Sequence, residues 1–329
     1  MKSQALLITG LNTIELAEVE IPSPQGREVL IETAFSGISP GTELRGLAGR
    51  QAGCPGFPCI PGYSMTGVVV EAGPKAGMQP GQRVFCNGTT RASVQLMWGG
   101  HCRHAVRDES SVFALPDEVS LQDASIAKLA AIARRGVSVG EAGPGECVAV
   151  IGLGPIGQLS ARLHALTGAR VCGVDLDSRR VERLNEAGVE AIQPGSGTLA
   201  EDLERIFPDG IDVVVDATGS PAVLEQSLLL ARIKEWEDAS PGPRLVVQGS
   251  YPATLTLPYE EAFRREVSIL FPRDQTSLEL EQVLQFMAEG KPKVADLVEE
   301  VAAPGDCQAV YDRLRDQDRG LLTAVFKWS

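Results

Sequence analysis

The sequence predicts an α/β protein in which a doubly wound parallel sheet follows a β-rich domain. Three observations support this prediction. The apolar run 147–151 has the composition of a buried strand and leads into the glycine pattern Gly152-x-Gly154-x-x-Gly157, with leucines at helical intervals behind it. From there to residue 271, strand-like and helical runs alternate, which is typical of a parallel sheet. Before residue 115, short strand-like runs are separated by glycine- and proline-rich turns.

The alternating region contains six expected strands and five expected helices. Each strand is a short apolar run, and each helix carries apolar residues at helical spacing. The expected strands are 147–152, 170–175, 191–192, 211–216, 244–248 and 267–271, and the expected helices are 155–167, 178–187, 198–206, 221–232 and 259–265.

The glycine pattern has the spacing of a dinucleotide-binding turn. The first glycine permits a tight turn, the second lets backbone approach a pyrophosphate, and the third lets helix and strand pack closely. The helix that follows offers unpaired N–H groups to the anion. Asp175 ends the next expected strand, close to the roughly 20-residue offset of an acid that binds the adenosine ribose. The alternative is a glycine-rich turn that binds nothing. We predict a dinucleotide site that comprises Gly152, Gly154, Pro155, Ile156, Gly157 and Asp175.

Composition excludes several classes of partner. The 329 residues carry a net charge of −13, which argues against nucleic-acid or anionic-membrane partners. No apolar run reaches the roughly 18 residues of a membrane span. The first residues lack the pattern of a signal peptide, and the seven cysteines are scattered and odd in number. We therefore expect a cytoplasmic protein with reduced thiols and a small-molecule substrate.

Four further motifs stand in order around the glycine pattern: Gly37-Ile-Ser-Pro-Gly-Thr-Glu43, Phe57 to Val68, Gly81-Gln-Arg-Val84 and Asp216-Ala-Thr-Gly219. Together they resemble the medium-chain dehydrogenase/reductase family. The stretches 36–43 and 61–63 look most like its bacteriochlorophyllide dehydrogenase branch. The resemblance implies a GroES-like catalytic domain over 1–118, a Rossmann domain over 119–272, and a segment 273–329 that returns to the catalytic domain. It also implies a homodimer that forms through the strand at 267–271.

The zinc-ligand positions of that family hold other residues in this chain. Ser39 or Pro40 stands at the cysteine position, and Tyr63-Ser64 stands where the family has His-Glu. Residues 130–133 are Ala-Ala-Ile-Ala and supply no third ligand, and only two cysteines lie in 86–111, where a structural zinc needs four. Hydroxyl groups are poor Zn²⁺ ligands compared with thiolate and imidazole. We therefore expect no metal.

Without zinc, a side chain must accept the proton of the substrate hydroxyl during oxidation and return it during reduction. The resemblance implies four catalytic candidates. Thr42 matches the proton-relay position, Glu43 matches the adjacent acid, Tyr63 projects into the vacated metal space, and His101 lies in a loop that resembles the family's pocket turn.

Each candidate has an alternative interpretation. Glu43 can be a buried structural acid paired with an arginine such as Arg45. Tyr63 can simply fill the former metal site. His101 and the nearby His104 can both be surface residues.

Asp175 also bears on the choice between NAD and NADP. A carboxylate at Asp175 binds the ribose hydroxyls of NAD and repels the 2′-phosphate of NADP, although Arg180 follows it and can meet that phosphate. NAD is therefore favoured over NADP, and the resemblance adds Thr218 and Gly249 to the site.

We predict a zinc-independent oxidoreductase that transfers a hydride between a nicotinamide cofactor and a secondary alcohol or ketone. The alternatives are a zinc-free quinone or enone reductase and a non-catalytic nucleotide-binding protein.

Overall fold

The computed structural model describes residues 1–251, 254–316 and 321–329. The chain divides into two compact units. The first unit is Met1–Leu129 together with Leu280–Ser329, and the second unit is Ala130–Glu279. The first unit runs to Leu129 where the sequence led us to expect a domain end at 118, and the second unit ends at Glu279 where we expected 272. The predicted combination of a β-rich GroES-like domain and a doubly wound parallel sheet is confirmed.

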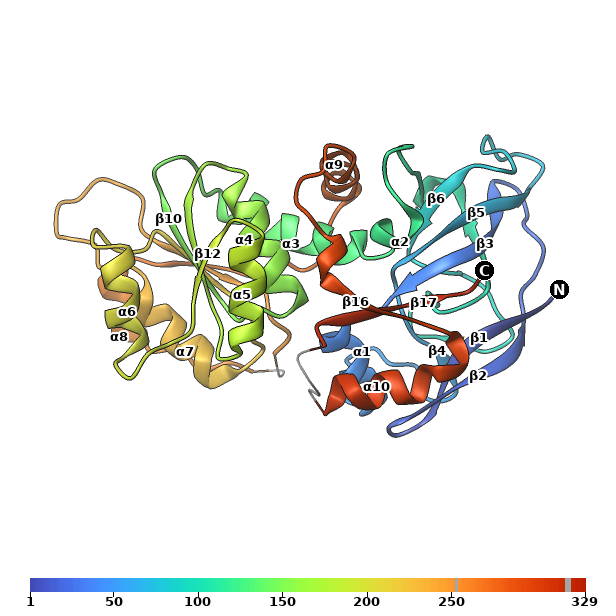
Figure 1. Ribbon diagram of the computed structural model, residues 1–329, viewed down its shortest axis with the longest axis horizontal. Coiled ribbons are helices and arrows are strands. Elements are labelled where there is room, and N and C mark those ends of the chain that lie inside the picture. Colours follow the sequence, from blue (N-terminus) through green and yellow to red (C-terminus); the bar gives the residue numbers. More distant parts are fainter. Residues whose placement is uncertain (252–253, 317–320) are drawn as a thin grey trace. The chain divides into compact units, whose positions relative to one another are not determined.

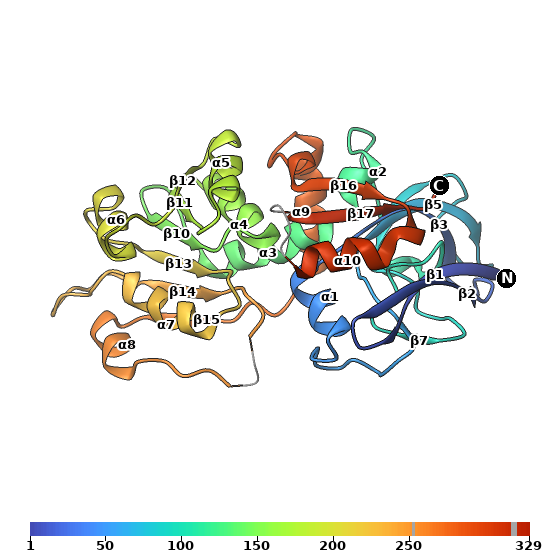
Figure 2. The same cartoon turned by 60° about the horizontal axis from the view of Figure 1, so that its bottom comes forward.

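The second unit is built on a six-stranded, all-parallel sheet (Figure 1), whose strands follow the order β12-β11-β10-β13-β14-β15 (Figure 2). The strand order reverses between β10 and β13, which is where α/β sheets of this kind bind ligands. All six expected strands and all five expected helices are present. The strands are β10 (Cys147–Ile151), β11 (Arg170–Val174), β12 (Glu190–Ile192), β13 (Val213–Asp216), β14 (Arg244–Val247) and β15 (Ser268–Leu270). The helices are α3 (Ala127–Gly140), α4 (Pro155–Ala165), α5 (Ser178–Glu186), α6 (Leu199–Ile206), α7 (Pro221–Leu230), α8 (Tyr259–Arg265) and α9 (Ser277–Ala288), of which α3 and α9 extend into the first unit.

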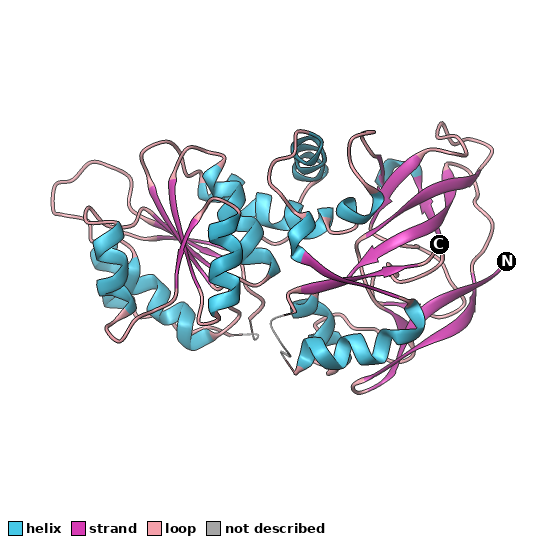
Figure 3. Cartoon of the chain, viewed as in Figure 1, coloured by secondary structure: helices cyan, strands magenta, loops and turns pink. Residues whose placement is uncertain are grey.

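Helices cover both faces of this sheet, as Figure 3 shows. Successive side chains of a strand point to opposite faces. On β10, Val148 and Val150 belong to a core with residues of α4 and α5, whereas Ala149 and Ile151 belong to a second core with residues of α6 and α7. The central strand is therefore buried on both sides, which explains its continuous apolar sequence.

The first unit contains two sheets. One has the order β2-β1-β4-β7, and the other has the order β16-β17-β3-β5-β6-β9, with β8 also paired to β3. The strands are β1 (Lys2–Gly10), β2 (Thr13–Glu20), β3 (Glu28–Gly37), β4 (Cys59–Ile60), β5 (Met65–Ala72), β6 (Arg83–Cys86), β7 (Gln95–Leu96), β8 (His104–Asp108), β9 (Val112–Ala114), β16 (Val298–Ala302) and β17 (Thr323–Lys327). The helices are α1 (Pro40–Leu47), α2 (Leu121–Ala124) and α10 (Cys307–Arg315).

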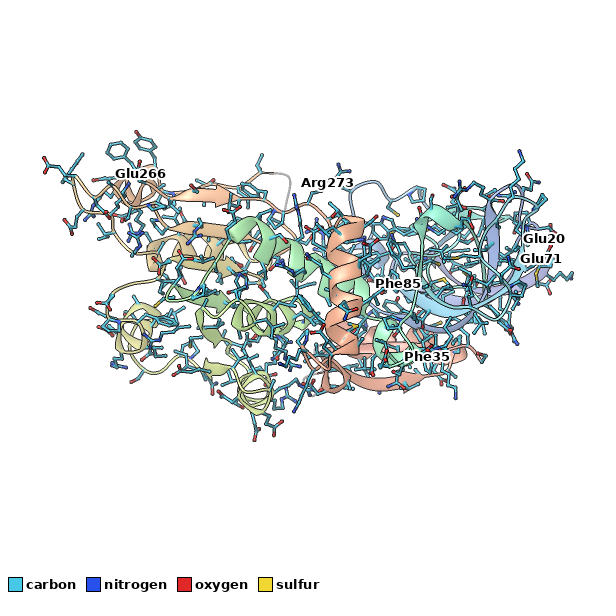
Figure 4. The ribbon with its side chains drawn as sticks, turned by 90° about the horizontal axis from the view of Figure 1, so that it is seen from above. Glu20, Phe35, Glu71, Phe85, Glu266 and Arg273 are labelled. Atoms are coloured by element: carbon cyan, nitrogen blue, oxygen red, sulfur yellow. The ribbon has the colours of Figure 1, made fainter. Side chains whose placement is uncertain are left out.

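The C-terminal segment completes the core of this first unit. Strand β17 pairs antiparallel with β3, so that Phe326 lies opposite Ser36, and α10 packs against α1 and β2 (Figure 2). Phe326 and Tyr311 are buried in one core with residues of β1, β2 and α1. Phe85, labelled in Figure 4, is also fully buried, whereas Glu71 is exposed. Among the described residues, no helix is both long and apolar enough to cross a membrane.

Candidate functional site

The turn between β10 and α4 has a backbone that only glycine allows. Gly152 has a φ of +87°, and a Cβ there would lie 2.8 Å from Cγ2 of Thr218. A Cβ on Gly157 would lie 1.8 Å from the carbonyl oxygen of Gly152, so a side chain would push α4 away from the turn. By contrast, nothing lies within 4 Å of the position that a Cβ on Gly154 would take. The space over Gly154 is therefore open at the start of α4, where Pro155 is the first helical residue and the helix N-terminus favours an anion.

Asp175 follows β11 and lies beside this turn. Its Oδ2 accepts a hydrogen bond from the backbone N–H of Leu153 at 2.6 Å, and its Oδ1 accepts one from that of Asp177 at 2.9 Å. These two N–H groups fix the carboxylate at the edge of the sheet. Nη1 of Arg180 lies 3.4 Å from the same Oδ2, so a cation stands next to the acid. Arg179 pairs instead with the side chain of Asp177 at 2.8 Å.

The ends of β13 and β14 meet at the same edge of the sheet. The buried carboxylate of Asp216 accepts hydrogen bonds from the backbone N–H and the hydroxyl of Thr218, at 2.9 and 2.7 Å, and also from the hydroxyl of Tyr251. Burial and the hydrogen bond to this carboxylate raise the pKa of Tyr251. A Cβ on Gly249 would lie 2.5 Å from the backbone nitrogen of Gly219, so the two loops touch.

The structure thus brings the sequence-predicted nucleotide residues to the carboxyl edge of one sheet. Gly152 to Gly157 follow β10, Asp175 follows β11, Thr218 follows β13 and Gly249 follows β14. A helix N-terminus with open space over Gly154 and a fixed carboxylate beside it fit a bound dinucleotide. Asp216 and Tyr251 were not predicted as site residues, although the motif that begins at Asp216 indicated that loop.

In the first unit, Tyr63 lies at the centre of a hydroxyl cluster. Its hydroxyl donates to Oγ of Ser39, the residue that precedes α1, and lies 3.3 Å from Oγ1 of Thr42 on the first turn of that helix. The side chain of Tyr63 is 9% exposed, and Thr42 is half-buried. Nζ of Lys128 lies 5.9 Å from the centroid of the Tyr63 ring, and the edge of the Trp98 indole contacts the same ring at 5.2 Å between centroids.

The other two predicted catalytic residues, Glu43 and His101, form a separate, fully buried pair. Oε2 of Glu43 lies 2.8 Å from Nε2 of His101 and also accepts from the hydroxyl of Tyr311 on α10. Oε1 of Glu43 accepts from the backbone N–H of Ser39 at 2.7 Å. Burial and the charge of Glu43 raise the pKa of Tyr311 well above its usual value, so this phenol remains a donor.

His101 connects Glu43 to the C-terminal residues of the chain. The indole N–H of Trp328, which can only donate, lies 2.9 Å from Oγ of Ser36. The same hydroxyl lies 2.8 Å from Nδ1 of His101, and Nε2 of His101 faces Glu43. Both ring nitrogens of His101 are therefore engaged by groups of the protein.

This network bears on the roles expected for Glu43 and His101. Neither side chain has any exposed surface, and both are engaged by groups of the protein, which favours a positioning role. The surface role weighed for His101 is wrong, and the partners of Glu43 are a histidine and a tyrosine instead of the expected arginine. Both are positioning residues that fix the start of α1, and with it Ser39 and Thr42. His104, the other histidine of that loop, is half-buried and lies 2.9 Å from Oγ of Ser3.

The donor set of the first unit does not fit a catalytic zinc ion. Among the described residues, no group of three or more His, Cys, Asp or Glu side chains could hold a metal. The hydroxyls of Ser39 and Tyr63 are hydrogen-bonded to each other, and both ring nitrogens of His101 are already engaged. Burial raises the pKa of the thiols of Cys86 and Cys102, which opposes the thiolate form that binds zinc.

Two family models match successive parts of the chain. The alcohol dehydrogenase GroES-like domain matches residues 25–117, and the zinc-binding dehydrogenase model matches residues 155–289. The chain belongs to the medium-chain dehydrogenase/reductase family and is an NAD(P)-dependent oxidoreductase. The family resemblance predicted from the motifs is therefore confirmed.

Relatives of this family match along nearly the whole chain. The chain is 25% identical to 2-desacetyl-2-hydroxyethyl bacteriochlorophyllide A dehydrogenase of Cereibacter sphaeroides, over 100% of this chain and 99% of the relative. It is also 25% identical to an alcohol dehydrogenase of Geobacillus stearothermophilus, over 92% of each chain. The fold is similar to that of an Escherichia coli oxidoreductase of unknown specificity, with a TM-score of 0.88, 20% identity and 99% of both chains covered. An E. coli short chain alcohol dehydrogenase complexed with NADH gives a TM-score of 0.85 at 20% identity, again over 99% of both chains.

Sequence reasoning missed several residues of the first-unit site. The sequence did contain a signal for Lys128. It is the single charged residue in the apolar run 126–133, and a lysine is rarely buried among apolar residues. Tyr311 and Trp328 carried none, because their partners Glu43 and Ser36 lie 268 and 292 residues away in the chain.

Proposed function

We propose that this protein is a zinc-independent, NAD-dependent oxidoreductase that acts on a secondary alcohol or the corresponding ketone. The observation that carries the proposal is the hydroxyl cluster of Tyr63, Ser39 and Thr42, which stands where the family resemblance places metal ligands. Reduction of a carbonyl requires a group that delivers a proton to its oxygen, and a phenol does so without a metal. The name of the C. sphaeroides relative specifies a hydroxyethyl group, which supports an alcohol substrate for this chain.

The mechanism assigns a separate task to each unit. In the second unit, the N–H groups at the start of α4 hold the pyrophosphate, and Asp175 binds the adenosine ribose. The bound cofactor supplies or accepts the hydride. In the first unit, Tyr63 exchanges a proton with the substrate oxygen, and Thr42, which is half-buried, connects the phenol to solvent. Glu43 and His101 hold the backbone that carries Ser39 and Thr42 in place.

Metal removal tests zinc independence. The purified protein is expected to contain far less than one zinc per chain by elemental analysis. Its NADH-dependent reduction of ketones from a panel should be unchanged after treatment with a strong chelator, because no group of three or more His, Cys, Asp or Glu side chains among the described residues could hold the ion. Zinc near one equivalent, with activity lost on chelation and restored by zinc, would show the proposal to be wrong. Turnover of enones with no turnover of ketones or alcohols would favour an alkene reductase.

Asp175→Ser is expected to lower the preference for NADH over NADPH by about tenfold to a hundredfold. The change removes the acceptor for the ribose hydroxyls and the charge that repels a 2′-phosphate, a loss of about 1.5–3 kcal/mol for hydrogen bonds to a charged group. It also frees Arg180, 3.4 Å from the carboxylate, to meet that phosphate. The measurement is kcat/KM for both cofactors.

The matched control for this experiment is Asp177→Ser. Asp177 lies two residues further on and its side chain pairs with Arg179. We expect its cofactor preference to remain within about threefold of the original, since exposed pairs contribute little. A native protein that already prefers NADPH, or an Asp175→Ser variant with unchanged preference, would contradict the assignment of NAD.

We also propose that two copies of the chain associate through the β15 edge of the parallel sheet. Among the described strands, β15 pairs only with β14. Beside it stand three exposed aromatic side chains, Tyr259, Phe263 and Phe271, of which the first two stack on each other. Tyr259 and Phe263 lie on α8, which ends before Glu266, labelled in Figure 4, and Phe271 follows β15. An open edge and an exposed apolar patch favour association. A solution mass equal to one 34.9 kDa chain by light scattering would exclude this dimer.

A further inference from the structure

We propose that Lys128 and Tyr63 form an acid–base pair: the Tyr63 phenol exchanges the substrate proton, and the Lys128 ammonium stabilises the phenolate that this exchange leaves. Lys128 acts through Tyr63 and is therefore a positioning residue. The direction of catalysis rests on the proposed function, but the pairing is a property of the folded chain alone. It assigns a role to a lysine that the sequence analysis passed over.

The first step of the argument is where the charge lies. Lys128 is in the first turn of α3, and only 5% of its surface is exposed. Its Nζ lies 5.9 Å from the centroid of the Tyr63 ring. Lysine is almost never buried to this extent without a specific electrostatic role, because desolvation of the ammonium is costly. Both residues belong to the first unit, so their contact lies within one compact body.

The second step is the rigidity of the phenol. Its oxygen is held by Ser39 and lies 3.3 Å from Oγ1 of Thr42, and its ring is held by the edge of Trp98. Trp98 has a φ of +75°, a conformation that costs a bulky residue free energy and tends to persist where function requires it. The indole remains 38% exposed, so this strained turn also places an aromatic surface beside Tyr63. The phenol oxygen is therefore fixed in one position.

The third step is the balance of charges around the phenol. Burial opposes its ionisation, and so does the carboxylate of Glu43, whose Oε1 accepts from the backbone N–H of Ser39. His101 packs against Gly62, and its two ring nitrogens face Ser36 and Glu43. The Glu43 charge is already neutralised in part by three hydrogen-bond donors. The ammonium of Lys128, 5.9 Å from the ring centroid, favours the phenolate.

These groups give a balanced proton transfer. In the reducing direction, a hydride carries two electrons to the carbonyl carbon, the O–H bond of Tyr63 breaks, and its proton joins the carbonyl oxygen to complete the alcohol. The phenolate regains a proton from the hydroxyl of Thr42, which takes one from water. Oxidation of the alcohol reverses each step. One ketone, one hydride and one proton thus give one alcohol.

A tyrosine titration tests the pair without cofactor or substrate. The chain has four tyrosines, so the ultraviolet difference between the native protein and Tyr63→Phe isolates a single phenol. In Lys128→Met the titration of this phenol should move up by about one pH unit or more, because the ammonium that lies 5.9 Å from the ring centroid is lost. Lys128→Arg should restore most of the shift, and Lys75→Met, which removes an exposed lysine, should leave it unchanged.

One result would overturn the pairing. It is an unchanged titration of the Tyr63 phenol in a Lys128→Met variant, or in Lys128→Gln if the first does not fold by circular dichroism. A titration shifted as expected in a protein that turns over no alcohol, ketone or enone would instead overturn the proposed function and leave the pair standing.

Discussion

Tyr63→Phe is expected to lower kcat for reduction of a ketone by about a hundredfold to ten-thousandfold, the usual contribution of a positioned general acid. The phenyl ring keeps its contacts with Trp98 and Lys128 but has no proton to give. Binding of the dinucleotide depends on the second unit, so KM for NADH should stay within about threefold. Steady-state kinetics with a ketone from the panel, at several pH values, measure both quantities.

Two variants control this result. Tyr259→Phe removes the hydroxyl of an exposed tyrosine in the second unit and should leave kcat unchanged. Thr42→Val removes the hydroxyl that lies 3.3 Å from Tyr63 and should lower kcat less, by about tenfold, because water can partly replace the relay. If Tyr63→Phe kept more than half of the native kcat in a folded protein, another group must deliver the proton.

The nucleotide site was predictable because its determinants are local. A run of β-branched residues, a glycine spacing and an acid at the end of the next strand all lie within about thirty residues of chain, and each has a direct backbone consequence. Gly157 illustrates this, since its Cβ would lie 1.8 Å from the Gly152 carbonyl and no other residue fits. The expected strands 147–152 and 170–175 differ from β10 and β11 by one residue.

The site of the first unit was predictable only in part. The motifs indicated Thr42, Glu43 and Tyr63 because they follow one another along α1 and the loop before β5. They did not indicate which groups those side chains would meet. His101 reaches Glu43 across 58 residues and Tyr311 reaches it across 268, and no local pattern encodes such contacts. Packing of α10 against the first 130 residues creates the contact of Tyr311, and the fold of the first 130 residues creates that of His101.

Lys128 is an intermediate case. The apolar run 126–133 is largely buried, and within such a run a lysine is an exception to burial preferences. The exception was visible in the sequence, although it was not used, and its partner was not visible. A deviation from a local rule can thus mark a position, whereas only the fold shows that the ring of Tyr63 lies beside it.

Glu43→Gln is expected to lower the free energy of unfolding of the first unit by about 3 kcal/mol. The carboxylate accepts from Ser39, His101 and Tyr311 in a fully buried position. An amide offers one acceptor oxygen and turns its N–H₂ group toward at least one of these donors, and each buried donor left without an acceptor costs about 1–3 kcal/mol. Trp328 donates to Ser36 in the same network, so its fluorescence follows unfolding in urea. The unfolding curves of the native protein and the variant then give the loss of free energy.

The matched control is Glu18→Gln, which removes the charge of an exposed glutamate that pairs with Lys2 at 2.7 Å. Exposed pairs contribute about 0–1 kcal/mol, so this variant should unfold close to the native midpoint. Kinetics separate the structural role of Glu43 from a chemical one. If Glu43 only positions α1, the folded Glu43→Gln protein should lose activity by raising KM for the ketone at least as much as it lowers kcat. A destabilisation below 1 kcal/mol, or a kcat loss as large as that of Tyr63→Phe with unchanged KM, would place the carboxylate in the proton transfer itself.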